Sequence, residues 1–126
     1  MAERRIIERV PRARRTPAVT AWAASVQRIE EARVELEAAL GTLAPWIVDA
    51  VDAIASGETM SDLVRRTQLR TRRRVADAVG AMNSALAENR VAAIRVVVDD
   101  EGLTMSEAAR LFGIPRQVLS RLYHAE

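Results

Sequence analysis

The sequence contains no cysteine and a single histidine among its 126 residues, and all 19 of its basic residues are arginine. Without cysteine, the chain has no disulfide, no thiolate metal ligand and no cysteine nucleophile. The lone histidine, His124, stands near the C-terminal end, where a surface position is the usual one. Because groups suited to catalysis or metal binding are so few, we expect no enzyme activity, no metal site and no cofactor.

Aromatic residues are equally scarce, at 3% of the chain, and alanine, valine, leucine and isoleucine supply most of its 49% apolar content. This composition favours helices that pack through small side chains, and no strand pattern competes with it. No uninterrupted apolar run is long enough to cross a bilayer. We therefore expect a soluble, cytoplasmic, nucleoid-associated protein with no membrane partner and no small-molecule substrate.

Charge is segregated along the chain, although the formal net charge is only +2. Residues 1–28 hold seven arginines against two acids, residues 29–64 hold one against eight, and residues 65–74 hold six against none. Such blocks indicate basic surfaces for a polyanion and acidic surfaces turned away from it. The expected partner is double-stranded DNA.

The periodicity of apolar residues predicts helices throughout, after an arginine- and proline-rich segment, residues 1–17, that reads as a flexible basic arm. A long amphipathic helix over 18–43 carries a stripe of Trp22, Val26, Ile29, Leu36, Leu40 and Leu43, with Gly41 near its end. That stripe can pack within the monomer or pair with a second copy in a homodimer.

Further helices are predicted from apolar spacing and from glycine and proline stops. The first covers residues 45–56, with Ile47, Val51 and Ile54 inward and Gly57 as its stop, and a short helix begins near Ser61. The next covers residues 71–89, with a stripe of Val75, Val79, Met82 and Leu86. The last three cover residues 90–101, which end at Gly102, residues 106–112 and residues 116–123.

An internal repeat appears at a spacing of 45 residues. The segment 57–62, GETMSD, aligns with 102–107, GLTMSE, and Arg65 aligns with Arg110. Each copy follows a predicted helix of similar length, so the repeating unit is a helix, a glycine stop, a short helix, a turn and another helix.

Residues 105–122, MSEAARLFGIPRQVLSRL, fit a helix-turn-helix pattern. Ala109 is the small residue at the helix crossing, and Gly113 occupies the turn position that often needs a positive φ. The apolar positions expected to be buried are Ala108, Phe112, Ile114, Leu119 and Leu122. Either Ser106 or Thr104 can cap the first helix, and Thr104 would form a capping box with Glu107. The segment resembles the helix-turn-helix of bacterial and phage regulators and of resolvase or invertase DNA-binding domains.

The resemblance implies that the second helix enters the DNA major groove. With its apolar side inward, the residues expected to contact bases are Arg116, Gln117, Val118, Ser120 and Arg121. Pro115 stands where many family members have a serine or threonine cap, so the phosphate contact made by that hydroxyl is absent here.

The upstream copy of the repeat is less regular, because Gln68 replaces the turn glycine and Arg74 falls at a position expected to be buried, unless the register slips by one residue to Val75. Its basic residues and Arg110 are candidates for contacts to the DNA backbone. This set comprises Arg65, Arg66, Arg70, Thr71, Arg72, Arg73, Arg74 and Arg110. The alternative is a solvated basic face paired with the acidic first helix.

The sequence thus predicts an all-α fold with tandem three-helix helix-turn-helix units, preceded by a long amphipathic helix. The expected divisions are an arm over 1–17, a helix over 18–43, a first unit over 44–89 and a C-terminal unit over 90–126. The predicted function is sequence-specific DNA binding in transcriptional regulation. The alternatives are a protein-interaction module of the antitoxin or adaptor type that docks through residues 18–40, and a nonspecific architectural DNA-binding protein.

Overall fold

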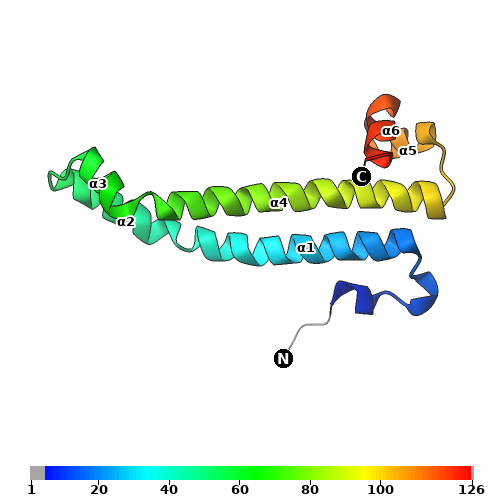
Figure 1. Ribbon diagram of the computed structural model, residues 1–126, viewed down its shortest axis with the longest axis horizontal. Helices are drawn as coiled ribbons and strands as arrows, with labels where there is room; N and C mark the ends of the chain where they lie inside the picture. Colours follow the sequence, from blue (N-terminus) through cyan, green and yellow to red (C-terminus); the bar gives the residue numbers. More distant parts are fainter. Residues whose placement is uncertain (1–4, 126) are drawn as a thin grey trace. The chain divides into compact units, whose positions relative to one another are not determined.

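The computed structural model describes residues 5–125, which contain no strand, so the predicted all-α class is confirmed (Figure 1). The α-helices are α1 (Pro17–Leu40), α2 (Leu43–Ala55), α3 (Met60–Thr67), α4 (Arg70–Arg95), α5 (Met105–Phe112) and α6 (Arg116–Tyr123). Shorter helical segments are the 3-10 turns η1 (Ile6–Arg9) and η2 (Arg12–Arg14) and the π-helical η3 (Val96–Asp100).

The chain divides into two compact units. The first, called here the terminal unit, combines the described residues up to Glu30 with those from Ser84 onward. The second, the central unit, comprises residues 31–83 and contains α2 and α3. Because α1 and α4 are long, each helix contributes one half to each unit.

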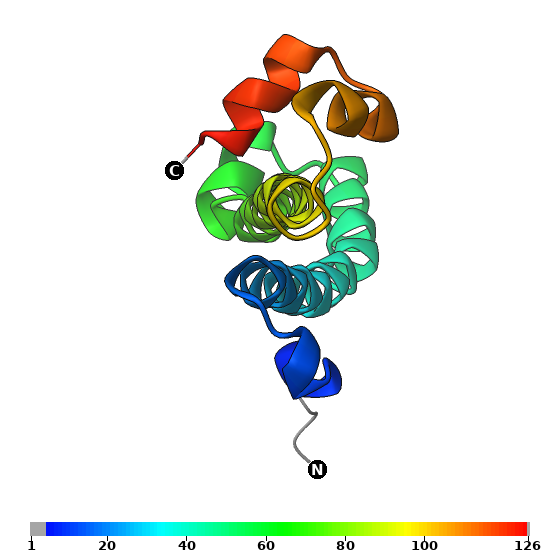
Figure 2. The same cartoon turned by 90° about the vertical axis from the view of Figure 1, so that its right-hand side faces the viewer.

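Within each unit α1 and α4 lie side by side and run in opposite directions (Figures 1 and 2). The buried alanines of α4 are Ala78, Ala85 and Ala92, seven residues apart, and the buried positions of α1 include Ser25 and Ala39. A seven-residue spacing is that of a coiled-coil seam, and small side chains at the seam let two helix backbones approach closely. The predicted packing through small side chains is confirmed.

Larger aliphatic residues flank this alanine seam. On α1, Trp22, Val26, Ile29 and Leu36 are half-buried and Leu40 is exposed; on α4, Val75 and Met82 are half-buried and Val79 and Leu86 are exposed. The predicted inward stripe on α4 is therefore only partly right, because alanine occupies its centre. With its stripe half-buried, α1 lacks the continuous exposed apolar side that docking through residues 18–40 requires.

The expected helix boundary between residues 89 and 90 is wrong, because α4 runs unbroken from Arg70 to Arg95. Neither Asn89 nor Arg90 stops a helix, and the Asn89 Nδ2 donates a hydrogen bond to Ser25 Oγ at 3.1 Å across the seam. The chain leaves the helix through η3, where Glu101 N–H donates to the Val96 carbonyl at 3.3 Å, five residues back. The division expected at 89/90 thus falls inside α4.

The prediction that Ile47, Val51 and Ile54 of α2 point inward is wrong, because they are 50%, 62% and 40% exposed. The side of α2 that packs on the central unit carries Leu43 and Trp46, which are half-buried, and no residue of α2 is fully buried. Because α2 is apolar around most of its circumference, its periodicity does not distinguish the inner from the outer side.

The N-terminal segment forms the two 3-10 turns η1 and η2, and neither contains a buried residue. Ile6 N–H donates to the Gln27 side-chain oxygen at 3.0 Å, which links the segment to α1. Residues 1–4 of the expected arm lie outside the described range, and the flexibility of 1–17 stays a prediction.

One helical stretch, Pro17–Ala55, is long and apolar enough to cross a membrane by length and composition, with little of it buried. Charged and polar residues interrupt this stretch, so it meets the criterion without being the uninterrupted apolar run that the sequence was searched for. However, α1 and α2 are separated at Gly41 and Thr42, and the 13 residues of α2 span about 20 Å against a hydrocarbon core of about 30 Å. The absence of a membrane partner stays a prediction.

The alanine seam predicts that Ala85→Leu destabilises the protein, because Ala85 is only 5% exposed and extra methyl groups would force the helices apart. We expect a loss of about 1–3 kcal/mol in the free energy of unfolding, measured by chemical denaturation. Ala87→Leu, on the exposed side of the same helix, is the control and should have little effect. Equal losses in both variants would contradict the seam.

Candidate nucleic-acid interface

The helix pair α5–α6 packs on the end of α4 around a small apolar core. Its fully or nearly fully buried members are Ile94, Ala108, Ala109 and Leu119. Phe112, Ile114 and Leu122 are partly buried against them, together with residues of η3 and the loop that follows it. Of the positions predicted to be buried, Ala108 and Leu119 are buried, and Phe112, Ile114 and Leu122 are half-buried against the same core.

Local signals in the sequence set the bounds of α5. Its N-cap is Thr104, whose Oγ1 accepts a hydrogen bond from Glu107 N–H at 3.1 Å and lies 3.0 Å from the Glu107 carboxylate. The alternative cap, Ser106, is wrong, because it lies inside the first turn. At the other end Gly113 has φ +68°, which a residue without a Cβ adopts at no steric cost.

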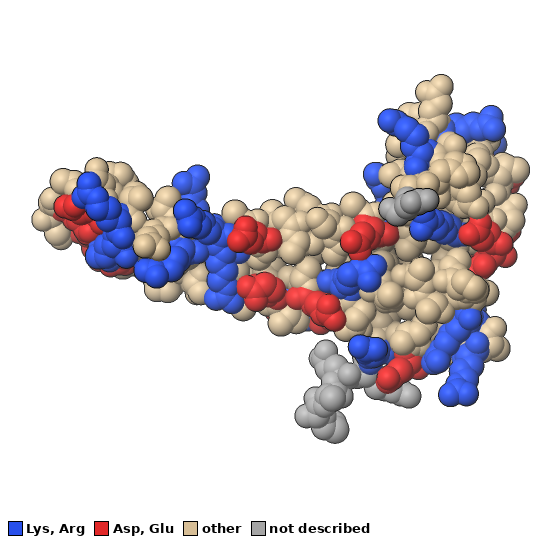
Figure 3. Space-filling view, in the orientation of Figure 1, with Lys and Arg blue, Asp and Glu red and all other residues tan. Residues whose placement is uncertain are grey.

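The outer side of α6 is open to solvent. Arg116, Gln117 and Arg121 are exposed, while Val118 and Ser120 are half-buried. Pro115, Arg116, Gln117, Ser120 and Arg121 line one open hollow. Within residues 5–125, Arg116, Gln117 and Arg121 have no hydrogen-bond or ion-pair partner in the structure. Basic side chains project from this part of the molecule (Figure 3).

Polar contacts hold the C-terminal end of α6 from its inner side. Arg95 Nε donates to the Tyr123 carbonyl at 3.3 Å, and Arg95 Nη2 donates to the Ala125 carbonyl. The Tyr123 hydroxyl donates to Asp99 Oδ1 at 2.6 Å. Sequence reasoning assigned no role to Arg95 or Tyr123 and interpreted Asp99 only as part of an acidic, solvated helix end, because spacing does not separate an anchoring side chain from a solvated one.

A second hollow lies where α5 approaches the start of α6. It is lined by Ser106, Ala109, Arg110, Gly113, Ile114, Pro115 and Arg116. Arg110 is exposed on α5 and shares this hollow with Arg116, so the two guanidinium groups belong to one surface. A phosphate of a duplex could be contacted from both helices there.

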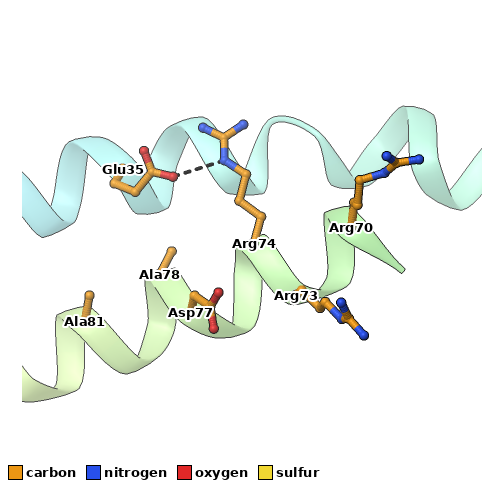
Figure 4. A pocket seen from close by; sticks show the side chains of 7 residues that line it. All are labelled: Glu35, Arg70, Arg73, Arg74, Asp77, Ala78 and Ala81. Atoms are coloured by element: carbon orange, nitrogen blue, oxygen red, sulfur yellow. Dashed lines mark hydrogen bonds and ion pairs between the residues drawn. The ribbon is translucent and has the colours of Figure 1, made fainter. Parts of the chain in front are cut away.

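Three of the arginines predicted to contact the DNA backbone form ion pairs in the central unit. Arg65 pairs with Asp62 at 2.7 Å, and Arg74 Nε lies 3.0 Å from Glu35 of α1 (Figure 4). Arg66 contacts Glu58 at 3.0 Å and Asp49 at 3.3 Å. The hydrogen bond that Arg66 donates to Glu58 raises the pKa of Arg66 above its ordinary value.

The other three arginines of this cluster, Arg70, Arg72 and Arg73, are exposed, and Thr71 beside them is half-buried. Among residues 5–125 they have no ion-pair partner. Figure 4 shows Arg70 and Arg74 on the side of α4 nearer α1, whereas Arg73 points away from α1. The cluster is therefore split between arginines neutralised within the unit and arginines open to a polyanion.

The two copies of the repeat share the first helix but differ after it. Like α5, α3 has eight residues and a threonine cap, Thr59, which accepts from Asp62 N–H at 3.1 Å. Its turn consists of Gln68 and Leu69, both with positive φ, and α4 follows with 26 residues where α6 has eight. The turn between α5 and α6 is one residue longer.

Residues 88–125 match a protein-family model described as helix-turn-helix, Psq domain. The match indicates a DNA-binding helix-turn-helix. It covers less than a third of the chain and includes the end of α4, η3, α5 and α6, which are the elements around the core just described. Neither the curated proteins nor the solved structures contain a match to the chain.

Acidic residues near the helix-turn-helix take part in hydrogen bonds. Asp99 accepts from Tyr123, and Asp100 accepts from the Thr16 hydroxyl. Over the described range, no group of three or more histidine, cysteine, aspartate or glutamate residues is placed to hold a metal ion. Asp99 and Asp100, although consecutive, therefore act through separate contacts.

The hydrogen bond to Asp99 raises the pKa of Tyr123, with smaller effects of burial and of the Asp99 charge in the same direction. Because Tyr123 is the only tyrosine, its phenolate absorbance in a pH titration reports this pKa alone. We expect a midpoint above the ordinary value of about 10 in the native protein, and the ordinary value in denaturant.

Because the pKa of Tyr123 is higher in the folded protein than in the unfolded chain, the hydrogen bond to Asp99 stabilises the protein fully at a pH below the unfolded-state pKa. This stabilisation is lost as the pH rises through the folded-state pKa. Asp99→Asn should lower the native midpoint toward that in denaturant, whereas Asp77→Asn on the exposed side of α4 is the control. A native midpoint equal to that in denaturant would exclude the contact.

Proposed function

We propose that the protein binds duplex DNA sequence-specifically, with α6 in the major groove. The observation that carries this proposal is the outer side of α6, where Arg116, Gln117 and Arg121 are exposed and have no partner within residues 5–125. Leu119, on the opposite side, is fully buried. A helix held in this way presents donors in the geometry that base edges require.

Each of the predicted base-contacting side chains can interact with a particular group on the edge of a base. Arg116 or Arg121 can donate two hydrogen bonds to guanine O6 and N7, and Gln117 can pair with adenine. Val118 can contact a thymine methyl group, and Ser120 can bond to either kind of base edge. The half-buried positions of Val118 and Ser120 make them the peripheral members of this set.

Backbone contacts complete the proposal. Arg110 lies beside Arg116, and Arg70, Arg72 and Arg73 form a second basic group on the α3–α4 copy of the repeat. Arg65, Arg66 and Arg74 must exchange their carboxylate partners for phosphates, which favours the unpaired arginines as the main contacts. We infer a transcriptional regulator of the bacterial or phage kind, without catalysis, that acts as a homodimer at the nucleoid.

The proposal predicts different effects for the two groups of arginines. Arg116→Ala and Arg121→Ala should each remove about 1–3 kcal/mol of discrimination between bases. The triple change Arg70→Ala, Arg72→Ala and Arg73→Ala should weaken binding to all sequences alike and reduce the slope of log K against log salt by about 0.9 per lost phosphate contact. Selection from a random duplex pool, followed by salt titrations, measures both.

Arg90→Ala serves as the matched control, because Arg90 is exposed on α4 outside both groups. It should leave the selected motif and the salt slope unchanged. Identical behaviour of the two groups would refute the division between base and backbone contacts. Binding of random DNA as tightly as any selected site would identify an architectural protein.

A further inference from the structure

The outer side of α2 is an uninterrupted apolar surface. At 100° per residue, Ala44, Ile47, Val48, Val51, Ile54 and Ala55 fall within one arc of about 120° of the helix. All six are exposed, the four larger ones by 40–62%. The only charged residues of α2, Asp49 and Asp52, lie outside this arc, which we call the α2 seam.

The residues of the central unit leave the α2 seam uncovered. Its fully buried hydrophobic side chains among the described residues are Ala39, Leu63 and Ala78, two of which are alanines. A soluble protein seldom leaves a contiguous apolar surface of this size open unless something binds there.

We propose that two copies of this chain pack against each other through the α2 seam, antiparallel, around a two-fold axis at Val51. In that register Val51 meets Val51 of the second copy, Val48 meets Ile54, and Ile47 meets Ala55. Large side chains face small or β-branched ones at every level, so the seam is complementary to itself, as a two-fold interface must be. The proposal goes beyond DNA binding and does not depend on it.

The area of the seam fits a dimer. At these exposures the four larger residues present roughly 350 Å² of surface, and the exposed Ala44 and Ala55 extend it to the size of a large patch on a monomer. Met60 and Val64 of the neighbouring α3, 61% and 38% exposed, add roughly 200 Å². The total approaches the ~800 Å² per partner of a standard interface.

Other occupants fit less well. Anionic lipid or nucleic acid would be repelled, because α2 contains two aspartates and no arginine. A bilayer span is disfavoured by the length of α2 and by the break before it. A second copy of the chain, in contrast, carries the same apolar surface and is present wherever the protein is.

The oligomeric state of the full chain tests the proposal. Sedimentation equilibrium over a range of concentrations should give a dimer that Val51→Glu dissociates at least about 100-fold more readily, because the change places two charges at the axis. Val34→Glu is the matched control, since Val34 is a 54% exposed valine on α1 outside the seam. Circular dichroism checks that both variants stay helical.

Cross-linking supplies a second readout, because the chain has no cysteine of its own. Val51→Cys should form a disulfide-linked dimer under mild oxidation, and Val34→Cys should not. A wild-type monomer at all concentrations, a dimer unaffected by Val51→Glu, or no cross-link at position 51 would each overturn the proposal.

Lipid is tested separately. Flotation of the wild-type chain with phosphatidylcholine and phosphatidylglycerol vesicles, lost in Val51→Glu, would overturn the dimer in favour of a membrane. Failure of the dimer is distinguishable from failure of DNA binding, because monomeric Val51→Glu would still bind a single half-site through α6.

Discussion

The orientation of α6 depends on one set of apolar contacts, those of Leu119 with the core around Ile94 and the two alanines of α5. A short helix of eight residues has little stability of its own, so its rotation about its axis is fixed by what it buries. Burial of Leu119 turns the arginines of α6 outward. Arg95 and Asp99 then hold the C-terminal end, which leaves the N-terminal end with Arg116 and Gln117 directed to solvent.

Whether an arginine can act on DNA depends on its neighbours in space, which a sequence does not list. Arg95 carries the same charge as Arg116, yet its N–H groups donate to backbone carbonyl groups at the end of α6. Arg66 is held by two carboxylates, one of them on α2, seventeen residues away along the chain. A count of charges in residues 65–74 therefore overstates the number of free cations.

The C-terminal helix pair could be predicted from sequence because its signals are local: a threonine cap, a glycine with positive φ, and apolar residues at fixed spacing. The α1–α4 seam could not, because alanine contributes little to a hydrophobic pattern although it decides how closely two helices approach. Ala78, Ala85 and Ala92 define the buried side of α4, and the conspicuous Val79 and Leu86 lie on its flank. Likewise, no glycine or proline stands at 89–90 to indicate a helix end, and apolar spacing alone placed the boundary there wrongly.

The two units differ in what stabilises them, and this difference bears on their roles. The terminal unit has a core with large side chains, Ile94 and Leu119, and the fully buried residues of its α1 half, Ala23 and Ser25, are small. The central unit buries mainly alanine and relies on exposed ion pairs such as Arg74–Glu35, which contribute at most about 1 kcal/mol each. The apolar side of α2 adds nothing to the stability of this unit while it faces water. If two copies pack through the α2 seam as proposed, the burial of that surface adds to the folding energy of the central unit, and its stability rises with protein concentration.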